Sequence, residues 1–203
     1  MSKLLMVRHG LTEYNVLHKF AGSTDIDMNH TGYKQIEKLR DRLEKFKIDS
    51  VYSSDLKRAA ESTKIVTSGR KLTINSTPKL RELDYGQIEG LSFGEIHHCF
   101  PEIARSMENH DRLVSFPGGE SFLLLAERIK GFVDEIRRLP PDRHVLIITH
   151  GGPLRMLICL LLEADLDLWW HLRIDNASLT IVETYSETAI LNLFNDTSHL
   201  DSL

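Results

Sequence analysis

Two histidines, two arginines and one glutamate in this sequence have the types and spacing to act together on one chemical group. His9 and His150 each follow a short apolar run typical of a buried strand, and each is followed by glycine. Because parallel strands end at the same edge of a sheet, both imidazoles are expected there. Arg8 precedes the first histidine, and Arg58 and Glu82 follow other strand candidates. We therefore expect all five side chains to surround a single point.

Phosphoryl transfer is the chemistry that these residue types fit. The group in transfer carries negative charge on its equatorial oxygens, so the protein must mainly position it and stabilise that charge. Arginine presents a fixed fork of donors that matches phosphate, which suits Arg8 and Arg58. The glycines beside the histidines, including Gly151, let backbone amides approach the phosphate oxygens.

Each remaining side chain has an expected role in such a transfer. A neutral imidazole attacks phosphorus, and we expect His9 to be this nucleophile and to form a covalent phosphohistidine. Glu82 is expected to hold a proton near neutral pH, because an anionic, partly desolvated pocket disfavours an ionised carboxyl. It would give that proton to the leaving oxygen and then deprotonate the attacking water. His150, if cationic, would stabilise the transition state.

Strands and helices that can position these residues alternate along the chain. Short apolar runs predict strands over 3–7, 50–53, 73–76, 145–149, 178–182 and 189–194. Apolar residues at helical spacing predict helices that begin near a cap at Thr31, over 56–68, over 93–109 with a break at Pro101, over 122–136, and from Pro153 as the first helical position. Residues 80–90, which contain Glu82, read as a loop.

This alternation predicts one α/β domain over residues 1–203, with three layers (α/β/α) around a mostly parallel sheet that leaves room for an antiparallel edge strand. A chain of 203 residues that is 41% hydrophobic can bury one such core. We expect residues 91–115 to form a lid over the substrate and residues 195–203 a mobile C-terminal tail. Within that tail, His199 either is solvated or folds toward the active site.

Composition excludes several classes of protein. The net charge of -4 and a pI near 6.2 argue against a binder of nucleic acid or of anionic membranes. The apolar runs at 4–7 and 156–162 are too short for a signal peptide and for a membrane span, so we expect a cytoplasmic protein. Cys99 and Cys159 do not suggest a disulfide scaffold.

Metal and nucleotide sites are not expected either. His97 and His98 are adjacent on a predicted helix and point in different directions, and no histidine pair has the i, i+4 spacing of a zinc site. The glycines at 118–119 lack the lysine and hydroxyl residues of a phosphate-binding loop. We expect no metal and no cofactor.

Four segments, in order along most of the chain, resemble the motifs of the histidine phosphatase superfamily, in the branch that includes cofactor-dependent phosphoglycerate mutases. They are Leu5 to Asn15 (LMVRHGLTEYN), Ser53 to Ala59 (SSDLKRA), Arg81 to Gly90 (RELDYGQIEG) and Thr149 to Gly152 (THGG). The resemblance implies a phosphorylated nucleophile at His9, a proton donor at Glu82, and a phosphate pocket of Arg8, Arg58 and His150. It also places Asn15 in the phosphate pocket, and Thr12, Gly22 and Tyr85 at positions that contact ligand.

The segments 116–122 and 193–200 look like those of small phosphatases of this branch, such as α-ribazole phosphatases. The chain lacks the proline-rich, basic insertion of typical mutases, because residues 101–115 mix acidic and basic side chains. The expected activity is hydrolysis of a small phosphate ester, with α-ribazole phosphate or a sugar phosphate as candidates. The alternatives are a phosphoglycerate mutase and a non-catalytic phosphate-binding interaction module. The sequence specifies no oligomeric state.

Overall fold

Six strands form one sheet within the residues that the computed structural model describes, which are 1–186, 188–201 and 203. In chain order the strands are β1 (Ser2–Arg8), β2 (Ser50–Ser53), β3 (Ile74–Ser76), β4 (His144–Thr149), β5 (Leu179–Thr184) and β6 (Ala189–Asp196). Their order across the sheet is β3-β2-β4-β1-β5-β6. Strands β1 to β4 run parallel, whereas β5 runs antiparallel to both of its neighbours, β1 and β6.

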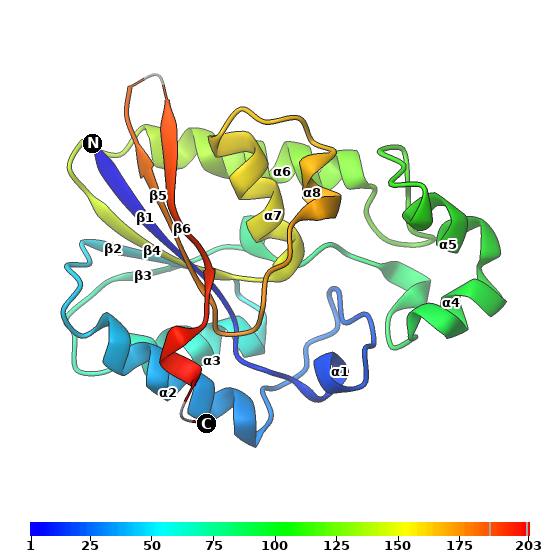
Figure 1. Cartoon of the computed structure of the whole chain (residues 1–203), viewed down its shortest axis with the longest axis horizontal. Coiled ribbons are helices and arrows are strands. Elements are labelled where there is room, and N and C mark those ends of the chain that lie inside the picture. Colours follow the sequence, from blue (N-terminus) through cyan, green and yellow to red (C-terminus); the bar gives the residue numbers. More distant parts are fainter. Residues whose placement is uncertain (187, 202) are drawn as a thin grey trace.

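Helices cover both faces of this sheet (Figure 1). The helices are α1 (Glu13–Val16), α2 (His30–Leu43), α3 (Lys57–Val66), α4 (Phe93–Cys99), α5 (Pro101–Glu108), α6 (Phe122–Arg137), α7 (Gly151–Leu161) and α8 (Leu168–His171). Short 3-10 helices span Pro78–Leu80, Gly86–Ile88 and Ser198–Leu200. The predicted three-layer α/β fold with a mostly parallel sheet is confirmed. The sequence suggested an antiparallel strand at the edge of the sheet. The antiparallel strand is β5, which lies next to the edge strand β6.

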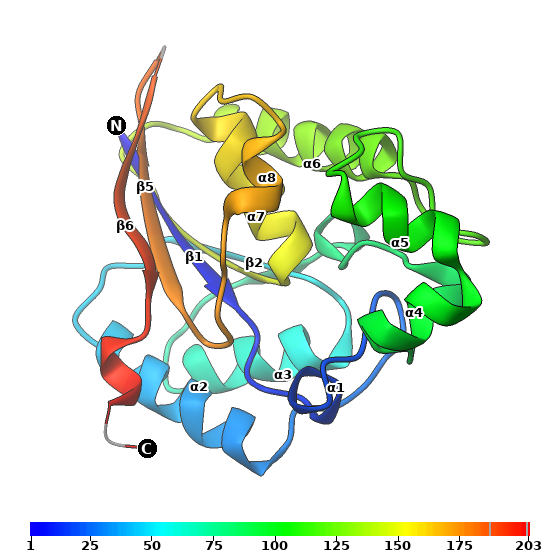
Figure 2. The ribbon, with the colours of Figure 1, turned by 45° about the vertical axis from the view of Figure 1, so that its right-hand side comes forward.

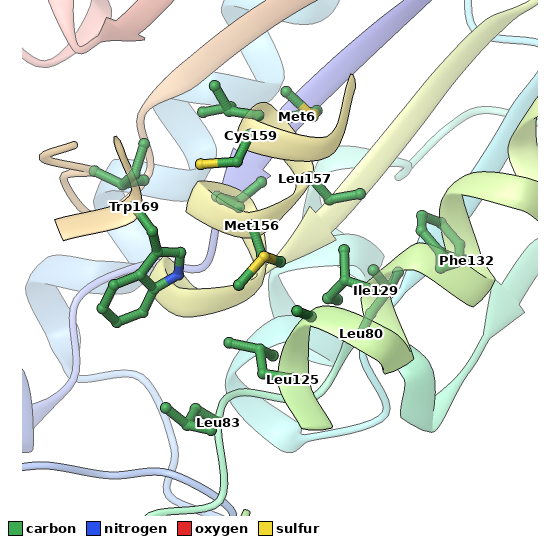
Figure 3. Packing of buried hydrophobic residues seen from close by; sticks show 14 of the residues in the cluster. Met6, Leu80, Leu83, Leu125, Ile129, Phe132, Met156, Leu157, Cys159 and Trp169 are labelled. Carbon is green, nitrogen blue, oxygen red and sulfur yellow. The ribbon is translucent and has the colours of Figure 1, made fainter. Parts of the chain in front are cut away.

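Alternate side chains of each central strand pack into two separate cores, as the two-residue period of a strand requires. Leu4 and Met6 of β1 join the core beneath α6 and α7, whereas Leu5 and Val7 join the core beneath α2 and α3. Figure 3 shows the first core, where side chains of α6 such as Leu125 and Ile129 face Met156 and Leu157 of α7. Burial on both faces explains why β1 and β4 read as continuous apolar runs rather than as alternating ones.

Two predicted helix starts are wrong by two residues. Helix α2 begins at His30 because Asn29, not Thr31, is its N-cap, and the Asn29 side chain accepts a hydrogen bond from the Gly32 amide. Helix α7 begins at Gly151, which makes Pro153 its third residue rather than its first. Any first-turn position tolerates a proline, since those amides have no partner within the helix. The earlier start leaves the amides of Gly151 and Gly152 available to other groups.

The segment predicted as a lid forms α4 and α5, which stand away from the sheet on the side where β1 ends (Figure 2). The expected break falls at Phe100, directly before Pro101. The segment predicted as a mobile tail begins inside β6 and continues as the Ser198–Leu200 turn, which packs beside α2. In the described part of the chain, no helix is long and apolar enough to cross a membrane.

Candidate active site

The two sequence-predicted histidines lie side by side because their strands are neighbours in the sheet. Arg8, the last residue of β1, pairs with Thr149, the last residue of β4. The next residue of each strand is His9 and His150, and their ring centroids are 5.0 Å apart. The parallel register therefore brings together two imidazoles that are 141 positions apart in the chain, as the sequence predicted.

His9 is fixed in the tautomer that a nucleophile needs. Its Nδ1 donates to the carbonyl oxygen of Gly10 at 2.7 Å, so Nε2 carries the lone pair. The side chain lines a pocket of about 510 Å³ although the residue is only 3% exposed. Burial, reinforced by the positive charges of Arg58 and Arg8, holds the pKa of His9 well below its usual value. The imidazole is therefore neutral and nucleophilic at neutral pH.

His150 is completely buried beside the pocket and is not one of the residues that line it. Arg58 donates from Nε to His150 Nδ1 at 3.2 Å, which leaves the proton of a neutral ring on Nε2, 2.8 Å from the Ser54 hydroxyl. Burial is the first cause, and the nearby Arg58 the second, that holds the pKa of His150 well below its usual value. The buried ring is therefore neutral in this structure, and the transition-state role of a cationic His150 stays a prediction. The ring accepts a hydrogen bond from Arg58 and so helps to fix the position of that guanidinium.

The two predicted phosphate-binding arginines are held by backbone carbonyls. Arg8 donates from Nη1 to Ile174 O at 2.6 Å, and its buried Nε has no partner among the described residues. Arg58, 1% exposed, donates to Thr24 O at 2.8 Å and to Gly22 O at 2.7 Å. Desolvation lowers the pKa of Arg58 to about 10, so it remains positively charged at neutral pH. Fixed guanidiniums in a pocket favour an anion, because little reorganisation is needed on binding.

Glu82 reaches the pocket from the loop that follows the Pro78–Leu80 turn. Its Oε1 accepts from the Gly152 amide at 3.1 Å and from its own neighbour, the Leu83 amide, at 2.9 Å. The first contact uses an amide that the early start of α7 leaves free. One carboxylate is thus held beside His9 and both arginines, in the arrangement expected from the sequence.

The other predicted ligand contacts divide into two groups. Asn15, Gly22, Tyr85 and Gly151 line the pocket. Thr12 does not: its buried side chain caps α1 and bonds the Asn15 side chain at 2.9 Å. Gly22 has φ +49°, and a Cβ there would lie 1.9 Å from Glu89 Oε1, so this position requires glycine.

Several residues at the site were given no individual role by the sequence. Asn176, between α8 and β5, donates from Nδ2 to His9 O and to Asn15 Oδ1, each at 3.1 Å. Glu89 accepts from the Ser23 and Thr24 amides and so fixes the loop whose carbonyls hold Arg58. The pocket lining also includes residues that sequence reasoning did not single out, namely His18, Lys19, Phe20, Phe93, Arg155 and Asp175.

His199 does not line this pocket, but it contacts Ala177 in the loop that precedes β5. Its Nδ1 accepts from Arg42 at 2.9 Å, and its Nε2 donates to Ala177 O at 3.1 Å. The Ala177 amide in turn donates to the carbonyls of Arg8 and His9. The C-terminal segment therefore braces the nucleophile's backbone and does not contribute a side chain to the pocket lining.

The close approach of Gly152 to Glu82 gives a testable prediction. A Cβ at Gly152 would lie 2.3 Å from Glu82 Oε1, so Gly152→Ala must displace the carboxylate while leaving α7 helical. We expect kcat for any reaction that uses Glu82 to fall by about 100-fold. Gly131→Ala on α6, where a Cβ meets nothing within 4 Å, is the matched control. Equal activity of the two variants would show that the position of Glu82 is unimportant.

Comparison with known proteins agrees with this geometry. The family model described as Histidine phosphatase superfamily (branch 1) matches residues 4–197. Phosphoserine phosphatase 1 of Hydrogenobacter thermophilus is 31% identical over 200 residues, which cover 98% of this chain and 95% of that protein. The structure of Bacillus stearothermophilus YhfR aligns with a TM-score of 0.92 at 29% identity and covers 99% and 100% of the two chains. The alpha-ribazole phosphatase of Shigella flexneri aligns with a TM-score of 0.88 at 26% identity and covers 96% of each chain.

Proposed function

The chain belongs to the histidine phosphatase superfamily, and from that premise we propose that it hydrolyses small phosphate monoesters without a metal ion, through a phosphohistidine at His9. The observation that carries the proposal is the state of His9. Its Nδ1–H donates to the Gly10 carbonyl, so Nε2 is the unprotonated nitrogen. The His9 side chain lines the pocket beside two fixed arginines. A neutral nitrogen nucleophile and an anion-binding pocket are the two requirements of this chemistry.

In the first step the lone pair of His9 Nε2 forms a bond to phosphorus as the ester P–O bond breaks. Glu82 gives a proton to the leaving oxygen, and Arg8, Arg58 and the α7 N-terminus stabilise charge on the phosphoryl oxygens. In the second step water attacks phosphorus and passes a proton to Glu82, the N–P bond breaks, and inorganic phosphate leaves. His9 and Glu82 end in their starting states, so the cycle is balanced.

The lid segment favours hydrolysis over the mutase alternative. A mutase must retain a bisphosphate and donate phosphate back, which calls for additional cations over the pocket. Of residues 91–115, Phe93 lines the pocket, whereas Arg105 pairs with Glu102 and Arg112 pairs with Asp165 and Asp167. The two arginines of this segment are therefore paired with carboxylates that do not line the pocket.

The names of relatives support a small metabolite as substrate. Phosphoserine phosphatase 1 of Hydrogenobacter thermophilus and the alpha-ribazole phosphatase of Shigella flexneri are named for two such esters. We include O-phosphoserine beside the two candidates from the sequence, α-ribazole phosphate and sugar phosphates. The cytoplasmic location expected from the sequence stays a prediction.

A panel of phosphate esters tests the proposal. We expect release of inorganic phosphate from at least one of these metabolites and from p-nitrophenyl phosphate, with no loss of rate in excess EDTA. Rapid isomerisation of 3-phosphoglycerate with a bisphosphate primer and no phosphate release would decide for the mutase. No hydrolysis of any ester would decide for a non-catalytic phosphate-binding module. A rate abolished by EDTA and restored by a divalent metal would contradict metal independence.

A further inference from the structure

A third guanidinium, that of Arg155, lines the pocket with Arg8 and Arg58. It stands one helical turn after Gly151 on α7, so it extends from the same face of the helix. The buried Nε of Arg155 has no hydrogen-bond partner among the described residues. Arg128 and Arg173 pair with Glu120 and Asp175, but no ion pair in the described part of the chain includes Arg155. No acidic side chain among the described residues therefore pairs with its charge.

An aromatic side chain holds this guanidinium in place. Its central carbon lies 5.0 Å from the ring centroid of Trp169, within the range of a cation–π contact. Trp169 is itself anchored, since its Nε1 donates to Gly152 O at 2.9 Å and its ring packs edge-on against Phe122. Figure 3 shows the indole beside α7, close to Met156. A preorganised arginine loses less conformational entropy when it binds a ligand.

The carboxylates that line the pocket have other partners. Glu82 accepts from the Gly152 amide, and Asp175 accepts from Arg173 and from the Asn195 side chain. Arg8 and Arg58 are the cations expected to hold the phosphoryl group. A substrate with only that one anionic group would leave the Arg155 donors without an acceptor in a partly desolvated site, which costs free energy.

We propose that Arg155 binds a carboxylate on the leaving group, so that the enzyme prefers phosphate monoesters of hydroxy acids over those of neutral alcohols. One planar guanidinium presents two parallel donors, which match the two oxygens of a carboxylate. This inference rests on the proposed function, because it names the class of ester that the same pocket takes.

Two pairs of esters that differ only at the carboxylate test the inference. They are 3-phosphoglycerate against glycerol 3-phosphate, and O-phosphoserine against O-phosphoethanolamine. For the wild type we expect phosphate release with kcat/KM about tenfold or more higher for the acid of each pair. Arg155→Gln should lower kcat/KM for the acids by about 10- to 100-fold, mainly through KM, because a charge-assisted hydrogen bond is lost. The two esters without a carboxylate should change by less than about threefold.

Two further variants complete the design. Arg155→Lys keeps the charge without the fork and should recover part of the preference. Arg137→Gln removes an exposed positive charge far from the pocket and should leave both members of each pair unchanged. An equal loss on acids and on esters without a carboxylate, or no loss with Arg155→Gln, would overturn the inference.

Binding to inactive protein separates this inference from the proposed function. In a His9→Ala background, calorimetry should show that 3-phosphoglycerate binds more tightly than glycerol 3-phosphate and that Arg155→Gln abolishes the difference. If the wild type hydrolyses no ester, the proposed function fails, and the binding measurement still decides whether Arg155 recognises a carboxylate. No difference in binding between the two esters would exclude that role.

Discussion

His9→Ala is expected to lower kcat on every phosphate ester by at least about 10⁴-fold, because it removes the atom that forms the covalent bond to phosphorus. The pocket should still bind phosphate esters, since Arg8, Arg58 and Asn15 stay in place. The fold should also persist, because the backbone of residue 9 keeps its hydrogen bonds to Thr149, Asn176 and Ala177. Steady-state release of inorganic phosphate measures the change.

The matched control is His30→Ala, which removes an exposed histidine at the start of α2. Its activity should equal that of the wild type. A second readout is chemical: wild-type enzyme mixed with ³²P-labelled substrate and quenched should carry acid-labile, base-stable label on His9. Label on another residue, or undiminished turnover in His9→Ala, would refute the assignment of the nucleophile.

Glu82→Gln is expected to lower kcat by about 10²- to 10⁴-fold on alkyl phosphates, whose leaving oxygen needs a proton. Glutamine keeps the shape of the side chain and an oxygen that can accept from the Gly152 amide, but it has no proton to give. The loss on p-nitrophenyl phosphate should be much smaller, because p-nitrophenolate leaves without protonation. Comparing kcat for the two ester types isolates the proton transfer.

Glu127→Gln, which changes an exposed glutamate on α6, is the control and should not affect either ester. Equal losses of kcat on alkyl and p-nitrophenyl esters in Glu82→Gln would assign Glu82 a structural role. A burst of p-nitrophenol followed by a slow phase would instead indicate that Glu82 acts in the second step, where water must be deprotonated.

The sequence predicted the central strands and much of the pocket lining, including Arg8, His9, Arg58 and Glu82, for a physical reason. Strands buried on both faces must be continuously apolar, so β1 and β4 stand out from their surroundings, and polar residues at their ends are easily recognised. Parallel pairing then requires His9 and His150 to be neighbours. Helix boundaries were less predictable, because Asn29 and Thr31 are both good caps and only the hydrogen bond to Gly32 distinguishes them.

The missed residues depend on how distant segments pack. Asn176 approaches His9 only because β5 lies beside β1, a neighbour relation that local pattern does not contain. Arg155 follows an ordinary helical pattern, and its isolation from acidic partners is a property of the folded pocket. The protonation state of His150 was left open by the sequence for a similar reason. Whether a histidine is protonated depends on its burial and on the donor that faces it, here Arg58.

The position of β1 has a consequence for biosynthesis. The strand that precedes His9 pairs with β4, residues 144–149, and with β5, residues 179–184. Neither partner exists when β1 leaves the ribosome, so the first strand waits on the order of ten seconds for its neighbours at ordinary elongation rates. A growing chain therefore has no assembled pocket until β4 and β5 have also been synthesised. His9 is thus synthesised well before the strands that complete its surroundings.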